Sequence, residues 1–264
     1  MPEYAAAAGT TIAYDTAGHG PDLIFLHAGI ADRTMWGPQV EAFSDRYRVT
    51  TLDARGFGNT PIGDEPFSRR DDLAAVMDAV GAKTASLVGC SIGAGFALDF
   101  AIERPERVDK LVLVGVTPAG FDGKDDELLE EMWPVVDAAI NAGEYEKAGR
   151  IEARLWVDGP HRDEGSAPEW LIDKVVEWSV PINKVKDWGD SRQLDPFAMH
   201  RLAEVQAPTL VIVGTLDADV ILAGCRATAA GIPDAQLVEL PGTAHLPNLE
   251  VPGPFDAALE SFFG

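Results

Sequence analysis

The sequence is poor in cysteine and basic residues, and it lacks any long apolar run. Its two cysteines, Cys90 and Cys225, show no CxxC spacing, and no HExxH motif occurs, so we expect reduced, buried thiols and no metal site. No apolar stretch approaches the roughly 18 residues that a membrane span requires. The first ten residues lack the basic segment and apolar core of a signal peptide. These absences predict a cytoplasmic protein without a membrane partner.

The scarcity of basic residues gives the chain a strongly negative charge. It has 43 acidic and 21 basic residues, for a formal net charge of −22. Nucleic acids and anionic membranes attract basic patches, so we expect neither as a partner. The same field repels strongly anionic substrates unless the pocket is locally basic.

Short β-branched runs alternate with helical patterns along the chain of 264 residues, a length typical of one large α/β domain. This alternation predicts a mostly parallel sheet with helices on both faces. The expected strands are 11–16, 22–27, 48–53, 84–88, 110–114, 209–213 and 236–240. The expected helices are 35–44, 70–80, 92–103, 220–230 and 254–263.

One interval interrupts this alternation after the strand near residues 110–114. Residues 121–195 show acidic helical patterns and no convincing strand, and they contain five of the six tryptophans. We expect a helical cap inserted over a core domain formed by residues 1–120 and 196–264. A tryptophan in such an insertion usually builds its core, whereas together they predict an apolar roof over a pocket. Trp156 is the candidate pocket residue.

The segment 89–93, Gly-Cys-Ser-Ile-Gly, is the most informative motif. It joins an apolar β-type run, 84–88, to an apolar helical run that starts at Ile92. A serine between a strand and a helix, with glycine two places away on each side, is typical of a nucleophile elbow. The turn strains the serine backbone and raises its hydroxyl above the sheet. Ser91 is therefore the predicted nucleophile.

A serine nucleophile requires a base and an acid. His245 lies in a turn directly after the last predicted strand, and Asp217 follows the strand 209–213. Loops at the carboxyl ends of parallel strands gather around one site, so both can meet Ser91. We expect His245 as the base and Asp217 as the acid. Asp219 competes with Asp217, which lies nearer the strand end.

The oxyanion of the reaction requires backbone donors. The N–H of Ile92 lies at the amino end of the elbow helix, where the helix dipole favours negative charge. We expect the second donor in the loop 27–30, with Gly29 favoured because its backbone can approach the reacting carbonyl closely. This chemistry predicts no cofactor and no metal.

The motifs together resemble those of the α/β-hydrolase superfamily, specifically its small, capped esterases and lactonases. They are LHAGI at 26–30, DARGFG at 53–58, GCSIG at 89–93, ERPERV at 103–108, GTLD at 214–217 and GTAHLPNLE at 242–250. The resemblance covers nearly the whole chain and implies the α/β-hydrolase fold, with the order serine, acid, histidine.

Three departures from the family pattern refine this implication. Ala28 stands where relatives carry glycine after the histidine. The loop therefore departs from the family pattern next to Gly29, the expected oxyanion donor. A serine nucleophile points away from haloalkane dehalogenases and epoxide hydrolases. Cofactor-free perhydrolases often carry methionine after the serine, where this chain has Ile92.

Other polar residues receive structural interpretations. We expect His27 to shape the oxyanion loop, His19 and His161 to be exposed and inert, and His200 to be structural. Asp53 and Arg55 are interpreted as a structural ion pair. Glu250 is expected to support the final helix.

The predicted function is a serine hydrolase that cleaves small-molecule carboxylic esters or lactones through an acyl-enzyme, as a monomer or homodimer. One alternative is a C–C bond hydrolase or enol-lactonase of aromatic degradation, which needs a cation for its anionic substrate; Arg150, Arg154 and Arg162 are candidates. Further alternatives are a cofactor-free perhydrolase and a non-catalytic ligand-binding relative.

Overall fold

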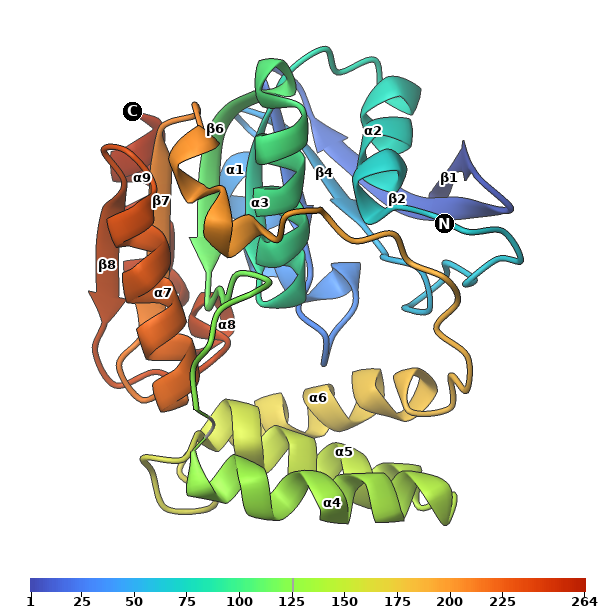
Figure 1. The fold of residues 1–264 in the computed structure, drawn as a ribbon, viewed down its shortest axis with the longest axis vertical. Coiled ribbons are helices and arrows are strands. Elements are labelled where there is room, and N and C mark those ends of the chain that lie inside the picture. Colours follow the sequence, from blue (N-terminus) through green and yellow to red (C-terminus); the bar gives the residue numbers. More distant parts are fainter. Residues whose placement is uncertain (125) are drawn as a thin grey trace.

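The computed structural model describes residues 1–124 and 126–264, so position 125 of the predicted cap lies outside the described residues. The described residues form one eight-stranded sheet in the order β1-β2-β4-β3-β5-β6-β7-β8 (Figure 1). The strands from β3 to β8 are parallel, and β1 and β2 are antiparallel. Their bounds are β1 (Glu3–Ala7), β2 (Thr10–Gly18), β3 (Asp22–Leu26), β4 (Arg48–Leu52), β5 (Ala85–Cys90), β6 (Val108–Val114), β7 (Thr209–Gly214) and β8 (Gln236–Leu240).

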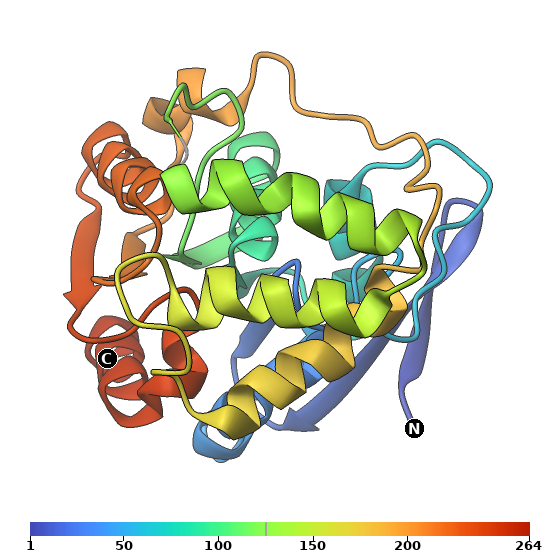
Figure 2. The same ribbon diagram turned by 90° about the horizontal axis from the view of Figure 1, so that it is seen from below.

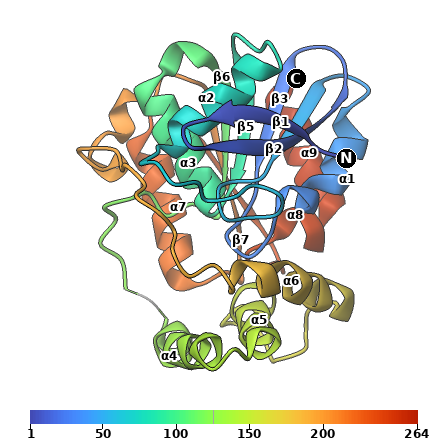
Figure 3. The same ribbon diagram turned by 90° about the vertical axis from the view of Figure 1, so that its right-hand side faces the viewer.

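The predicted α/β architecture, a mostly parallel sheet with helices, is confirmed, and each of the seven predicted strands corresponds to one of β2 to β8. The first strand was missed. β1 pairs with β2 as an antiparallel hairpin at the sheet edge (Figure 3). Its alanine-rich sequence has weak β propensity and few side chains to pack, and only Ala5 within it is buried. The alternation that identifies a strand is therefore absent from this segment.

Helices cover both faces of the sheet, as the sequence predicts (Figure 1). One face carries α2 (Arg69–Ala79), α3 (Ile92–Glu103) and α7 (Asp219–Gly231). The opposite face carries α1 (Gly37–Phe43), α8 (Pro247–Glu250) and α9 (Pro252–Phe263).

The central strands supply both hydrophobic cores. Leu87 of β5 belongs to the core on the α3 side, and its neighbour Val88 belongs to the core on the α9 side. In β6, Leu113 belongs to the core on the α3 side and Val114 to the core on the α9 side. Because successive strand residues point to opposite faces, a strand buried on both sides is apolar throughout. This explains the continuous apolar runs in the sequence.

A helical layer lies beyond the carboxyl ends of the parallel strands (Figure 1). It consists of α4 (Glu127–Asn141), α5 (Tyr145–Ala153), a short π-helix, η3 (Arg154–Asp158), and α6 (Glu169–Ile182). Seen from below, α5 runs beside α4 and also contacts α6 (Figure 2). The layer is fixed to the core through apolar side chains that join both hydrophobic cores, among them Leu129, Leu155 and Leu171.

None of the helices in the described part of the chain has the length and hydrophobicity to cross a bilayer.

Candidate active site

Ser91 lies in a strained turn between β5 and α3. Its φ of 54° and ψ of −115° fall in a region that residues with a side chain rarely adopt. Its N–H donates to the carbonyl of Val114, at the end of β6, at 2.8 Å. A Cβ on Gly89 would meet the Gly93 carbonyl oxygen at 2.3 Å, and one on Gly93 would meet the Leu26 carbonyl oxygen at 2.5 Å. Both glycines are therefore required where the helix passes the strands.

Asp217 and His245 form a buried pair. Oδ2 of Asp217 accepts a hydrogen bond from Nδ1 of His245 at 2.8 Å, and the side chains are 1% and 2% exposed. They follow β7 and β8, which are adjacent and parallel. The two loops are also joined by their backbones, since the Leu216 N–H donates to the Thr243 carbonyl at 3.0 Å. This geometry fixes the imidazole orientation and leaves its Nε2 as the free ring nitrogen.

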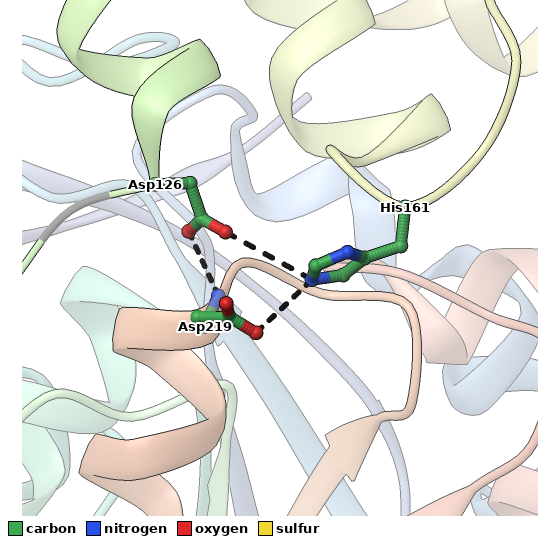
Figure 4. A group of neighbouring side chains, drawn as sticks. All are labelled: Asp126, His161 and Asp219. Carbon is green, nitrogen blue, oxygen red and sulfur yellow. Dashed lines mark hydrogen bonds and ion pairs between the residues drawn. The ribbon is translucent and has the colours of Figure 1, made fainter.

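The competing acid, Asp219, has different partners (Figure 4). Its Oδ1 lies 3.1 Å from Nε2 of His161, and its N–H donates to Oδ2 of Asp126 at 2.8 Å. Burial raises the pKa of the Asp126 carboxyl. His161, which was expected to be exposed and inert, is exposed and joins the helical layer to the core. Asp219 thus belongs to this contact, and Asp217 to His245.

The turns that carry Ser91 and His245 lie side by side. The thiol of Cys90, directly before Ser91, lies 3.7 Å from the His245 carbonyl oxygen. Gly115, directly after the Val114 partner of Ser91, approaches the imidazole so closely that a Cβ there would lie 3.1 Å from its Cε1. Within the described residues, the hydrogen bonds of Ser91 are made by its backbone, and its hydroxyl is not bonded to His245. Hydrogen bonds of this kind are often long without substrate.

The two predicted oxyanion donors are neighbours. Gly29, in the loop after β3, lies against Ile92, because a Cβ on it would be 3.5 Å from the Ile92 side chain. The preceding amide, of Ala28, donates to the sulfur of Met35 at 3.3 Å. The N–H of Ile92 is in the first turn of α3, where amides have no intrahelical acceptor.

His27 crosslinks the oxyanion loop. Its Nε2 accepts from the Ala54 N–H at 3.0 Å, so its Nδ1 carries the proton and donates to the Ala28 carbonyl at 2.8 Å. Burial lowers the pKa of His27, which keeps the ring neutral. This arrangement supports its predicted structural role and leaves no ring nitrogen free to act as a base.

The predicted ion pair between Asp53 and Arg55 is wrong in its partners. Asp53 accepts from the guanidinium of Arg33 and from the N–H of Asn59 at 2.8 Å. Arg55 makes a bidentate, buried pair with Asp72, at 2.7 and 2.8 Å. Each of these two charges is compensated by a residue from another segment of the chain.

Glu250 also has a different role from the predicted one. Its carboxylate accepts from the Ala244 N–H at 2.9 Å, beside His245, and from Arg162 of the helical layer at 2.7 Å. Its side chain is 4% exposed. Glu250 therefore holds the turn of His245 and ties it to the helical layer.

Trp156, on the π-helix η3, packs directly on the imidazole of His245. The ring centroids are 4.6 Å apart, and the Trp156 carbonyl accepts the His245 N–H at 3.2 Å. π-Helical turns occur frequently at functional sites. The sequence predicts Trp156 as a pocket residue, but its contact with His245 has no sequence signal.

If the predicted ester hydrolysis takes place here, replacing Trp156 with alanine is expected to lower kcat/KM for an activated ester by about two- to twelvefold, since an aromatic contact contributes about 0.5–1.5 kcal/mol. Trp156→Phe should lose less. The matched control is Trp170→Ala, whose ring is 56% exposed and lies on α6. Equal losses in the two alanine variants, measured by steady-state kinetics, would contradict a role for the contact with His245.

A cavity of about 280 Å³ opens beside Ser91. Its described lining contains a carboxyl, from Asp99, and no basic side chain. The lining residues are Ser91, Ile92, Gly95, Phe96, Asp99, Gly115, Thr117, Ala119, Gln193 and Ile221.

The three candidate cations for an anionic substrate have other contacts. Arg162 pairs with Glu250, as described above. Arg154 donates to the Gly159 carbonyl at 2.7 Å, and Arg150 is exposed and lies 3.6 Å from Asp173.

The buried cysteines do not compete with Ser91 as nucleophiles. Both thiols are free, and burial raises the pKa of each. A thiol that stays protonated is a poor nucleophile and a poor metal ligand.

Comparison with known proteins identifies the family. The sequence profile of the alpha/beta hydrolase fold matches residues 21–252, most of the chain. The chain belongs to the α/β-hydrolase family. The resemblance drawn from its motifs is thereby confirmed.

Similar α/β-hydrolases include esterases. A pimeloyl-[acyl-carrier protein] methyl ester esterase of Aeromonas hydrophila is 26% identical over 96% of this chain and 100% of its own length. A carboxylesterase of Bacillus subtilis is 27% identical over 88% of this chain and 76% of its own. Among solved structures, an enol-lactonase of Burkholderia xenovorans superimposes with a TM-score of 0.80, covering 99% of each chain, at 22% identity. That likeness shows a shared fold.

Proposed function

We propose that this α/β-hydrolase is a serine hydrolase that cleaves small-molecule carboxylic esters or lactones, with Ser91 as nucleophile, His245 as base and Asp217 as acid. Ester hydrolysis is the activity of the similar esterases from Aeromonas and Bacillus. The observation that carries the proposal is the buried hydrogen bond of 2.8 Å between Asp217 and His245, next to a strained serine. We retain the expectation of a cytoplasmic monomer or homodimer as a prediction.

The reaction begins when Ser91 Oγ attacks the ester carbonyl and passes its proton to Nε2 of His245. The tetrahedral oxyanion accepts hydrogen bonds from the Gly29 and Ile92 amides. Imidazolium then protonates the leaving alcohol, and an acyl-enzyme remains on Ser91. Water, deprotonated by His245, attacks the acyl carbon and releases the acid. Asp217 remains ionised throughout and stabilises the imidazolium.

The C–C hydrolase alternative is disfavoured by the cavity lining. That reaction requires a cation near its anionic substrate, whereas the charged residue in the described lining is Asp99. Neutral esters and lactones carry no such requirement. A carboxylate in the cavity also repels anions, in the same direction as the net charge of −22.

A fluorophosphonate probe tests the proposal against a non-catalytic relative. The probe should form one covalent adduct, detected by intact mass and mapped to Ser91, and hydrolysis of p-nitrophenyl acetate should fall in proportion to labelling. Ser166→Ala, at an exposed serine, is the control that keeps labelling. The absence of an adduct in folded protein, or an adduct elsewhere, would refute the assignment of Ser91.

A further inference from the structure

The cavity beside Ser91 follows one face of α3. Ser91, Gly95 and Asp99 all line it, and they are spaced four residues apart. Residues at this spacing lie above one another on a helix. With a rise of about 1.5 Å per residue, the eight residues from Ser91 to Asp99 span about 12 Å. The lining therefore extends along α3 from the nucleophile to a carboxyl, and we call this cavity the channel.

Gly95 keeps the middle of this channel open. Among the described residues, a Cβ on Gly95 would meet no heavy atom within 4 Å beyond its chain neighbours and the backbone of its own helix, and its backbone is helical with an ordinary φ. Glycine inside a helix is destabilising relative to alanine. No close approach or positive φ requires glycine here, so its structural effect is free space. Ile92, Phe96 and Ile221 give the channel apolar walls.

At the far end of the channel, the Asp99 carboxylate has a long ion pair but no hydrogen bond among the described residues. Asp99 is 9% exposed, and in the described chain its carboxylate has no hydrogen bond. Its nearest cation, Arg70, is 3.8 Å away and donates instead to Glu103 at 3.0 Å. The hydroxyl of Thr117, which also lines the cavity, has no hydrogen-bond partner among the described residues. Leaving a buried polar group unsatisfied is unfavourable, so this end is suited to a donor from a ligand.

We propose that the channel binds the tail of the substrate, which extends from the reacting carbonyl along Gly95 and ends in a hydroxyl or ammonium group held by Asp99. This inference rests on the proposed function and names its substrate class: esters or lactones with a medium-length chain and a terminal hydrogen-bond donor. A terminal carboxylate is rejected by Asp99. Short esters leave the channel empty and are turned over without this selection.

The charge state of Asp99 distinguishes the two donors. Burial is the main cause that raises the pKa of Asp99 to about 6; Arg70 and Arg201 oppose the rise, and Glu103 adds to it. Below this pH the carboxyl is neutral, and above it the carboxylate attracts an ammonium tail. An alkylammonium, with a pKa of about 10.4, stays charged throughout. The preference for an ammonium over a methyl terminus should therefore increase as pH rises through about 6.

The experiment uses ratios of kcat/KM, in which pH effects on the shared chemistry of Ser91 and His245 cancel. The substrates are p-nitrophenyl acetate and p-nitrophenyl decanoates that end in methyl, hydroxyl, ammonium or carboxylate. A second series consists of acetate esters of decanols with the same four termini. It tests whether the channel binds a tail on the alcohol side of the ester. We expect the wild type to prefer hydroxyl and ammonium over methyl by at least about tenfold on one of these sides, because a site built to bond a donor discriminates strongly.

Variants locate the selection. Gly95→Leu should lower the decanoate-to-acetate ratio by at least about tenfold, and Gly95→Ala by less. Asp99→Asn should lose the ammonium preference and keep that for hydroxyl, while Asp99→Leu should lose both. Asp78→Asn, an exposed carboxyl on α2, is the matched control and should leave the ratios unchanged.

Two outcomes would overturn the inference. One is a wild type that hydrolyses the acetate yet treats methyl and donor termini alike. The other is an unchanged chain-length ratio in Gly95→Leu. If Asp99→Leu fails to fold, the pH dependence of the wild-type ratio still decides the role of Asp99. Failure of the proposed function looks different, because no ester is then turned over and the fluorophosphonate leaves Ser91 unlabelled.

Discussion

Replacing Ser91 with alanine is expected to lower kcat for p-nitrophenyl acetate by at least about a thousandfold. Removing the nucleophile of a serine hydrolase leaves only the catalysis that binding and oxyanion donors supply. Alanine keeps the Cβ, so the strained turn at φ 54° is retained and the substitution removes a single oxygen. The loss should therefore appear in kcat, with the fold unchanged.

Two measurements make this result interpretable. Thermal unfolding and circular dichroism should show a Tm close to that of the wild type, because the Ser91 hydrogen bonds to Val114 and Gly95 are made by its backbone. Ser166→Ala, at an exposed site, should retain full activity. Turnover by Ser91→Ala within tenfold of the wild type would contradict the acyl-enzyme mechanism.

Local patterns were sufficient to predict most of the fold. The run from Ile92 to Glu103 is apolar and ends before a proline, and α3 has these bounds. Central strands that are buried on both faces have continuous apolar runs in the sequence. These runs predict β5, β6 and β7. The carboxyl ends of parallel strands lie at one edge of a sheet. The topology alone therefore predicts that the loops of Ser91 and His245 lie close together.

Long-range pairings of side chains were not predictable from sequence. Asp53 compensates Arg33, and Arg55 compensates Asp72. The charges to be paired are evident from the sequence, but their partners depend on how separate loops meet. The packing of Trp156 on His245 has the same origin, since the helical layer and the last strand are far apart in sequence. Such contacts follow from tertiary packing, which local propensity does not predict.

Asp217→Asn is the second substitution with a large expected effect, a loss of about a thousand- to ten-thousandfold in kcat. The carboxylate accepts the Nδ1 proton of His245 at 2.8 Å, which in the proposed mechanism leaves Nε2 unprotonated to act as base. An asparagine amide donates to Nδ1 instead, which moves the ring proton to Nε2. The ring then cannot accept the Ser91 proton, and no carboxylate stabilises an imidazolium.

Asp219→Asn is the matched control, with the same chemical change two residues away. Asp219 contacts His161 and Asp126, and its side chain is 71% exposed, so its ion pair contributes at most about 1 kcal/mol to stability. We expect kcat within about threefold of the wild type and a small decrease in Tm. Equal damage in both variants would indicate a general disturbance of the loop after β7. A larger loss in Asp219→Asn would transfer the role of acid to that residue and require the two loops to rearrange when substrate binds.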